Sequence, residues 1–280
     1  MKDGFINLNK NSGMTSHDAV NRVRKIFFTR KVGHAGTLDP VASGVLPIAI
    51  GRATKFIEYL ADCEKIYRAE ILFGISTDSG DLEGEIISRA DDFSLNNDEL
   101  IAALKDFIGE IEQTPPKFSA IKIHGRKAYD LARKNLDFEM PSRKVKIFDI
   151  KLIATEKNTA TLEISCGKGT YIRSLAIDIG ERLKIPATLK NLIRLRVGDF
   201  DIKKSALIDE LSAENILPIE DCLKHLPKFE LDARRIRAFM NGLPTTLNLP
   251  DKNALRVFAD GKFLGVGRIE RGELRSSKII

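Results

Sequence analysis

One carboxylate stands out among the residues of this chain that could do chemistry. Asp39 lies in residues 33–46, GHAGTLDPVASGVL, which hold three glycines and one proline. Glycine lets a backbone turn tightly, and Pro40 biases Asp39 away from helical backbone angles. We therefore expect Asp39 on a rigid loop, where a carboxylate can act as nucleophile, base or ligand. The alternative is an ordinary turn in which the side chain bonds its own backbone, and Asp-Pro alone favours that alternative.

Two other polar segments match no motif for nucleotides or metals. Residues 167–173, GKGTYIR, place glycines beside Lys168, yet the phosphate-loop pattern GxxxxGK[ST] is absent. Residues 77–84, TDSGDLEG, hold three carboxylates without the ligand spacing and closing glutamate of a calcium loop. We interpret residues 77–84 as a hairpin connection, and we expect no metal and no cofactor.

The segment around Asp39 is part of a longer pattern. Four stretches together resemble the motifs of the bacterial tRNA pseudouridine-55 synthases, the TruB family: HAGTLDP at 34–40, GRATK at 51–55, GTYIR at 169–173 and LKNLIRLRVGDF at 189–200. The resemblance runs from Phe5 to about Arg196 and is weaker towards the C-terminus. Asn11 departs from the family, which often has proline there, but this position lies away from the chemistry.

The resemblance implies roles for single residues. Asp39 matches the family's catalytic aspartate, and Arg173 matches the arginine that pairs with it. A guanidinium near a carboxylate keeps it ionised and fixes its direction. Four more residues match positions that contact the substrate uridine or help to displace the RNA: Tyr67, Tyr171, Leu192 and His34. From residue type alone, Tyr67 and Leu192 are ordinary packing residues, and the alternative for His34 is a hydrogen-bonded histidine in a turn.

The implied reaction isomerises uridine to pseudouridine at position 55 in the T-arm of tRNA. The N1–C1′ bond breaks, the uracil rotates, and a C5–C1′ bond forms, so neither redox chemistry nor an external group is needed. One carboxylate suffices, either by attacking the sugar or by taking its C2′ proton, and the sequence does not choose between these routes. The base must also be flipped out of the folded RNA, at a cost of roughly a few kcal/mol.

Positive charge and aromatic rings alternate in residues 117–146. The segment is rich in Lys and Arg, including Lys122, Arg126 and Lys127, with Phe118, His124 and Tyr129 between them. Phosphate neutralisation together with base stacking suits an RNA loop. The resemblance implies an RNA-binding thumb at about 115–146, whereas charge patterning alone equally fits a solvated surface loop.

Composition limits the remaining possibilities. The chain has 280 residues, 43% hydrophobic content and a net charge of +6, which suits a globular protein with a polyanionic partner. The three cysteines form no CxxC pair, so we expect reduced thiols and a cytoplasmic location. No signal peptide or membrane span is expected, since neither an apolar leader nor an 18-residue apolar window occurs. Nothing in the sequence indicates a protein partner.

Hydrophobic periodicity predicts both strands and helices, and together with the resemblance it leads us to expect an α+β protein. Apolar alternation or apolar runs predict strands at 5–8, 45–50, 65–73 and 159–166, and helical spacing predicts helices after Thr15 and at 98–111 and 174–183. The resemblance implies a catalytic domain over 1–226, with a mixed and mainly antiparallel sheet. A small PUA-like RNA-binding domain should follow at 227–280, with a helix closed by Gly242 and a hairpin on Asp260-Gly261.

Three other functions remain open at this stage. A pseudouridine synthase could act on another RNA, and a non-catalytic tRNA-folding or binding protein could use the thumb and C-terminal region alone. A glycosidase would need two carboxylates, and the sequence supports only Asp39 well.

Overall fold

The structure is a computed structural model that describes residues 2–119, 121–123, 125–134 and 136–280. His124, one of the aromatic residues of the predicted thumb, lies outside these ranges. The chain divides into two compact units. The first unit comprises residues 1–38, 45–61 and 198–280, and the second unit comprises residues 39–44 and 62–197.

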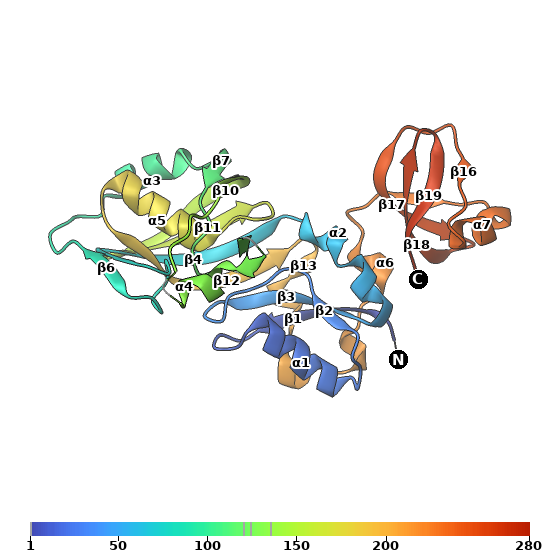
Figure 1. Ribbon diagram of the computed structural model, residues 1–280, viewed down its shortest axis with the longest axis horizontal. Helices are drawn as coiled ribbons and strands as arrows, with labels where there is room; N and C mark the ends of the chain where they lie inside the picture. The colour runs from blue at the N-terminus through green and yellow to red at the C-terminus, as the bar shows by residue number, and fades with distance from the viewer. Residues whose placement is uncertain (1, 120, 124, 135) are drawn as a thin grey trace. The chain divides into compact units, whose positions relative to one another are not determined.

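The second unit is built on antiparallel strands. In spatial order these are β12 (Ala187–Val197), β4 (Lys65–Phe73), β11 (Thr159–Cys166), β10 (Arg143–Glu156) and β7 (Gly109–Gln113). Burial alternates along β4 and β11, so the strands predicted there are confirmed. Helix α5 (Ile172–Leu183) packs against β12 and β4, and α3 (Asn97–Lys105) packs against α5 and β10 (Figure 1).

Helix α3 is shorter than the spacing of its apolar residues predicts. Asn96 caps it by accepting hydrogen bonds from the amides of Asp98 and Glu99. The prediction was wrong at the other end, because residues 109–111 belong to β7 and pair with β10. The helix ends at Lys105, and Gly109, with φ = 114°, is the first residue of the strand.

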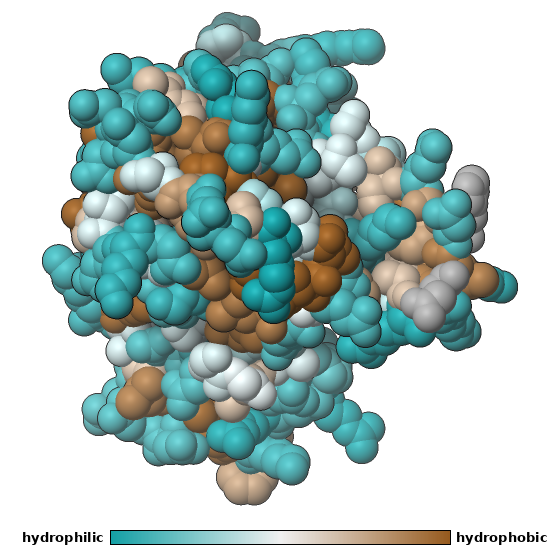
Figure 2. Space-filling model, turned by 90° about the vertical axis from the view of Figure 1, so that its left-hand side faces the viewer, coloured by the Kyte–Doolittle hydropathy of each residue, from teal (hydrophilic) through white to brown (hydrophobic). Residues whose placement is uncertain are grey.

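Short elements complete the second unit. Residues 77–84 join two strands in a hairpin, as predicted: β5 (Ile75–Thr77) and β6 (Ile86–Arg89). The thumb contributes β8 (Lys122–Ile123), β9 (Arg126–Lys127) and α4 (Ala128–Ala132). Some hydrophobic side chains of the second unit are exposed at the surface. Ile87, in β6, is 67% exposed. Figure 2 shows such side chains gathered among hydrophilic ones on the face that it draws.

The N-terminal part of the first unit starts with β1 (Gly4–Lys10) and α1 (Ser16–Ile26). Thr15 and Asp18 form the capping box that starts α1, which confirms the predicted helix start. Strand β2 (Val32–His34) pairs antiparallel with β3 (Ser43–Ile50), whose first two residues belong to the second unit. The short segments that follow are η1 (Gly51–Phe56), α2 (Glu58–Ala61), β13 (Phe200–Asp201), η2 (Ile202–Lys204), β14 (Ala206–Leu207), η3 (Ile208–Glu210), η4 (Ala213–Asn215) and α6 (Ile219–Cys222).

The C-terminal part of the first unit forms a small sheet of its own. The strand order is β15 (Lys228–Glu230), β17 (Lys252–Ala259), β18 (Lys262–Glu270), β19 (Glu273–Ile279) and β16 (Thr245–Thr246). Phe239 of α7 (Ile236–Met240), which follows η5 (Ala233–Arg235), is fully buried in its core. Asp260 and Gly261 both have positive φ and connect β17 to β18, so the predicted hairpin is confirmed. The predicted α+β class, with a β-rich C-terminal part, is thus also confirmed.

Candidate active site

Asp39 lies on the loop between β2 and β3, outside any helix. The Ala42 amide donates a hydrogen bond of 3.1 Å to the Asp39 carbonyl oxygen and closes a turn. The Asp39 side chain is 33% exposed. Its carboxylate can therefore be reached by a substrate while its backbone is fixed.

Gly44 fixes the outgoing end of this loop. Residues Ser43 and Gly44 pair in parallel with Ile193 and Arg194 of β12. Gly44 has φ = 104°, and a Cβ placed on it would collide with the Arg194 backbone. Only glycine permits this close approach, so the glycine after Asp39 holds the loop against β12.

Arg173 provides the charge that faces Asp39. It is the second residue of α5, its side chain is 5% exposed, and its Nε lies 3.0 Å from Asp39 Oδ2. This contact is an ion pair, because Nε has no aligned hydrogen-bond acceptor among the described residues. Arg173 Nη1 donates to the Ser79 carbonyl and Nη2 donates to the Phe118 carbonyl, each at 3.0 Å. The guanidinium is therefore held on three sides, and its direction is fixed.

A second carboxylate lies against the same guanidinium. Asp81 Oδ2 is 3.5 Å from Arg173 Nη1, and the Asp81 side chain is only 9% exposed. Asp81 Oδ1 accepts hydrogen bonds from Ser79 Oγ at 2.6 Å and from the Glu83 amide at 3.1 Å. The sequence indicated only a hairpin connection here, and no spacing signal could have linked Asp81 to a residue so distant in the chain.

The neighbouring strands β4 and β12 hold two of the predicted site residues, Tyr67 and Leu192, and an arginine beside Tyr67. Tyr67 is buried and its Cα is paired with that of Arg194, while Leu192 is buried opposite Ala69. Burial raises the pKa of the Tyr67 hydroxyl, and the hydrogen-bonded Arg194 partly offsets this rise. Tyr67 is therefore a neutral ring at physiological pH. Sequence reasoning did not assign Arg194 to the site, because an arginine in a strand is usually exposed.

Tyr171 immediately precedes α5 and is held from two directions. The Arg143 guanidinium lies over its ring, 4.8 Å from the ring centroid, and also donates to the Gly169 carbonyl. The Gln113 side chain bonds both backbone polar groups of Tyr171. Tyr171 and Arg173 are thus presented by one fixed segment at the start of α5.

The remaining predicted residues lie elsewhere in the chain. His34 ends β2 in the first unit, opposite Ile48. Lys122, Arg126 and Lys127 are exposed on β8 and β9, where Lys122 is paired with Lys127. Lys127 also lies over the Tyr129 ring and donates to its hydroxyl at 3.1 Å. The structure therefore places basic and aromatic side chains together in the thumb, as the sequence pattern suggests.

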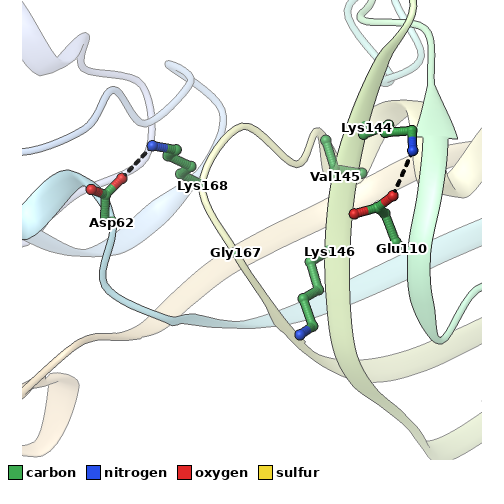
Figure 3. Close-up of a pocket in the computed structure, with 7 residues that line it drawn as sticks. All are labelled: Asp62, Glu110, Lys144, Val145, Lys146, Gly167 and Lys168. Atoms are coloured by element: carbon green, nitrogen blue, oxygen red, sulfur yellow. Dashed lines mark hydrogen bonds and ion pairs between the residues drawn. The ribbon is translucent and has the colours of Figure 1, made fainter.

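A separate open pocket of about 350 Å³ lies in the second unit (Figure 3). It is lined by Asp62, Glu110, Lys144, Val145, Lys146, Gly167 and Lys168. Lys144 pairs with Glu110 at 2.8 Å and Lys168 pairs with Asp62 at 2.6 Å, which leaves little net charge in it. In the described ranges, no group of three or more His, Cys, Asp and Glu side chains could hold a metal ion, and no helix is long and apolar enough to span a membrane.

Comparison with known proteins decides the family. A family model described as TruB family pseudouridylate synthase (N terminal domain) matches residues 24–172, and one described as Pseudouridine synthase II TruB, C-terminal, matches residues 227–280. The chain belongs to the TruB family of pseudouridylate synthases. It is therefore an isomerase that forms pseudouridine, and the resemblance noted in the sequence is confirmed.

Two tRNA pseudouridine synthase B proteins are similar in sequence to most of this chain. The tRNA pseudouridine synthase B of Clostridium kluyveri is 42% identical over 275 residues, which cover 95% of both chains. That of Bacillus pumilus is 46% identical over 268 residues, which cover 91% of this chain and 86% of the other.

Solved structures show the same fold. One described as a Cbf5-Nop10-Gar1 complex has a TM-score of 0.77 at 25% identity, covering 99% of this chain and 84% of that chain. Another, of an H/ACA RNP bound to a substrate RNA containing 2′-deoxyuridine, has a TM-score of 0.75 at 23% identity, with the same coverage. The TruB fold predicted from the sequence is thereby confirmed.

The contact between Asp81 and Arg173 gives a first prediction. Asp81→Asn keeps an oxygen that can accept from Ser79 and Glu83 but removes the charge beside Arg173. We expect the single-turnover rate of pseudouridine formation to fall about tenfold to a hundredfold, which corresponds to about 1.4–2.7 kcal/mol. RNA affinity, measured by filter binding, should change less than threefold.

Asp78→Asn is the matched control for this experiment. Asp78 lies on the same loop, but its carboxylate accepts from the Glu85 amide and not from Arg173. Its rate should stay within about threefold of wild type. Equal losses in the two variants would mean that the loop, and not the charge on Arg173, is what matters.

Proposed function

We propose that this TruB protein isomerises uridine 55 in the T-arm of tRNA, with Asp39 as the catalytic residue. The observation that carries the proposal is the pairing of a one-third exposed carboxylate with a buried guanidinium that is fixed by two backbone carbonyls. Such a carboxylate has a set direction and one open side. The relatives named tRNA pseudouridine synthase B support tRNA as the substrate.

The chemistry requires one reacting carboxylate and a base held outside the RNA stack. Asp39 either attacks C1′ and displaces N1 of the uracil, or removes the C2′ proton and leaves a glycal. After the freed uracil rotates, C5 displaces the Asp39 oxygen from C1′ in the first route, or adds to C1′ of the glycal while the proton returns to C2′ in the second. In both routes the C5 proton then leaves and N1 gains a proton. Tyr67, Tyr171 and Leu192 are proposed to contact the flipped uridine by stacking and apolar packing, and His34 to help displace it.

RNA binding is assigned to charged regions outside the reacting centre. We place it in the thumb at 115–146, with Lys122, Arg126 and Lys127, and in a PUA-like domain at 227–280 that follows a catalytic domain at 1–226. Residues 227–280 hold 11 Lys and Arg against 6 Asp and Glu, so most of the chain's net charge of +6 resides there. A polyanionic RNA would be attracted to that excess. A tRNA substrate also fits the cytoplasmic location expected from the reduced cysteines.

The Asp39 assignment gives a second prediction. Asp39→Asn keeps the size of the side chain but removes its charge and nucleophilic oxygen. We expect near-total loss of pseudouridine formation, with RNA affinity kept within about tenfold, or about 1.4 kcal/mol. The measurement is tritium release from [5-³H]uridine in a T-arm hairpin, because formation of the C5–C1′ bond expels the C5 hydrogen.

The same assay separates the other candidate functions. Wild type that converts a ribosomal hairpin but not the T-arm hairpin would be a synthase for another RNA. Wild type that converts neither would be a tRNA-folding or binding protein, and release of free uracil would indicate a glycosidase. Substantial conversion by Asp39→Asn, with deamidation back to aspartate excluded, would rule out Asp39 as the catalytic residue.

The thumb gives a third prediction. Replacing Lys122, Arg126 and Lys127 together with alanine should weaken the binding of a T-arm hairpin. It should also flatten the slope of log K against log salt by about 0.7–0.9 for each phosphate that the thumb no longer neutralises. Lys122 and Arg126 are both exposed, so their charges are available to phosphates.

A control triple variant uses exposed basic residues of the second unit outside the thumb: Arg89, Lys105 and Lys151. Its salt slope should match that of wild type. A thumb variant whose slope is also unchanged would place the thumb charges on a face that only solvent contacts.

A further inference from the structure

The two ends of the predicted thumb both contact Tyr171, the residue that precedes α5. The chain leaves the sheet at Gln113, the last residue of β7, and returns at Arg143, the first residue of β10. These two residues are cross-strand partners in the antiparallel pair β7–β10. Both contact Tyr171, so the two ends of the excursion meet at one residue of the proposed site.

Gln113 holds the backbone of Tyr171. Its Oε1 accepts from the Tyr171 amide at 2.7 Å and its Nε2 donates to the Tyr171 carbonyl at 3.1 Å. Gln113 is 1% exposed, and these two bonds satisfy an amide whose burial would otherwise be unfavourable. The Gln113 side chain thus makes the two hydrogen bonds that a peptide group of a neighbouring strand would make. It fixes both the N–H and the C=O of Tyr171.

Two more bonds join the same stretches of chain. Ser174 Oγ donates to the Thr114 carbonyl at 2.7 Å, and Arg173 Nη2 donates to the Phe118 carbonyl at 3.0 Å. The donors Ser174 and Arg173 are both buried, so these bonds satisfy polar groups that would otherwise be costly to bury. The start of α5 is therefore positioned by the residues that lead into the thumb.

We propose that Gln113 is a positioning residue, which sets Tyr171, and through it Arg173, in the geometry that the reaction needs. Arg143 completes this role by lying over the Tyr171 ring. RNA bound by the thumb would then exert force on the segment that carries Tyr171 and Arg173. This inference rests on the proposed function, and it adds to it the path by which the thumb and the site are joined.

The test compares three variants. Gln113→Met keeps the length of the side chain but removes both bonds to Tyr171, and Gln113→Glu keeps the acceptor and loses the donor. Glu112→Gln, on the exposed face of the same strand, is the control. Single-turnover rates are measured with saturating T-arm hairpin, and affinity is measured with a hairpin that carries unreactive cytidine at the target position.

Hydrogen exchange in the free protein gives a readout that does not depend on activity. The Tyr171 amide should exchange faster in Gln113→Met than in wild type, because its acceptor is gone, while residues 188–197 should be unchanged. If wild type leaves the T-arm hairpin unconverted, the proposed function fails, but the exchange at Tyr171 still decides whether Gln113 holds this residue.

We expect the single-turnover rate to fall at least tenfold in Gln113→Met and less in Gln113→Glu, with affinity within threefold of wild type in both. Glu112→Gln should match wild type. A merely structural role would lower the unfolding temperature and leave the rate of the folded protein unchanged. If Gln113→Met does not fold, Gln113→Glu decides alone. A wild-type rate in a folded Gln113 variant, or unchanged exchange at Tyr171, would overturn the proposal.

Discussion

The buried guanidinium of Arg173 is the constraint on which the rest of the site depends. Burying a charge is unfavourable by several kcal/mol unless it is paired and hydrogen-bonded. Arg173 is also in the first turn of α5, where the helix dipole disfavours a cation. Two carboxylates and two backbone carbonyls offset the cost of burying the Arg173 charge. One of these carboxylates is the partly exposed Asp39.

This balance explains why distant segments converge on one side chain. The Ser79 and Asp81 contacts fix the hairpin at 77–84, and the Phe118 contact fixes the residues leading into the thumb. Gly44 holds the other side of the site by letting the Asp39 loop approach β12. The Asp39 carboxylate is therefore placed by its surroundings, and in the proposed reaction it would have no need to reorganise, which is how a fixed charge contributes most to catalysis.

Local chemistry made much of the fold predictable. The glycines and proline around Asp39 indicated a loop, Thr15 indicated a helix start, and Asp260-Gly261 indicated a hairpin, because each signal depends on neighbours in the chain. The helix predicted to reach residue 111 failed: it ends at Lys105, although Ile108 and Ile111 continue its apolar spacing, because residues from Gly109 pair with β10 as a strand. The family motifs paired Asp39 with Arg173. No pattern indicated Asp81, Arg194 or Gln113, because their contacts exist only after distant segments have packed together.

The single-turnover rate of an Arg173→Lys variant tests the central claim most directly. Lysine keeps the positive charge but has one compact ammonium, so it cannot contact Asp39, Asp81 and the Phe118 carbonyl at the same time. If a guanidinium fixed on three sides directs Asp39, the rate should fall at least a hundredfold, or about 2.7 kcal/mol, with RNA affinity within threefold and the fold intact. A folded Arg173→Lys variant that forms pseudouridine within threefold of the wild-type rate would contradict the account.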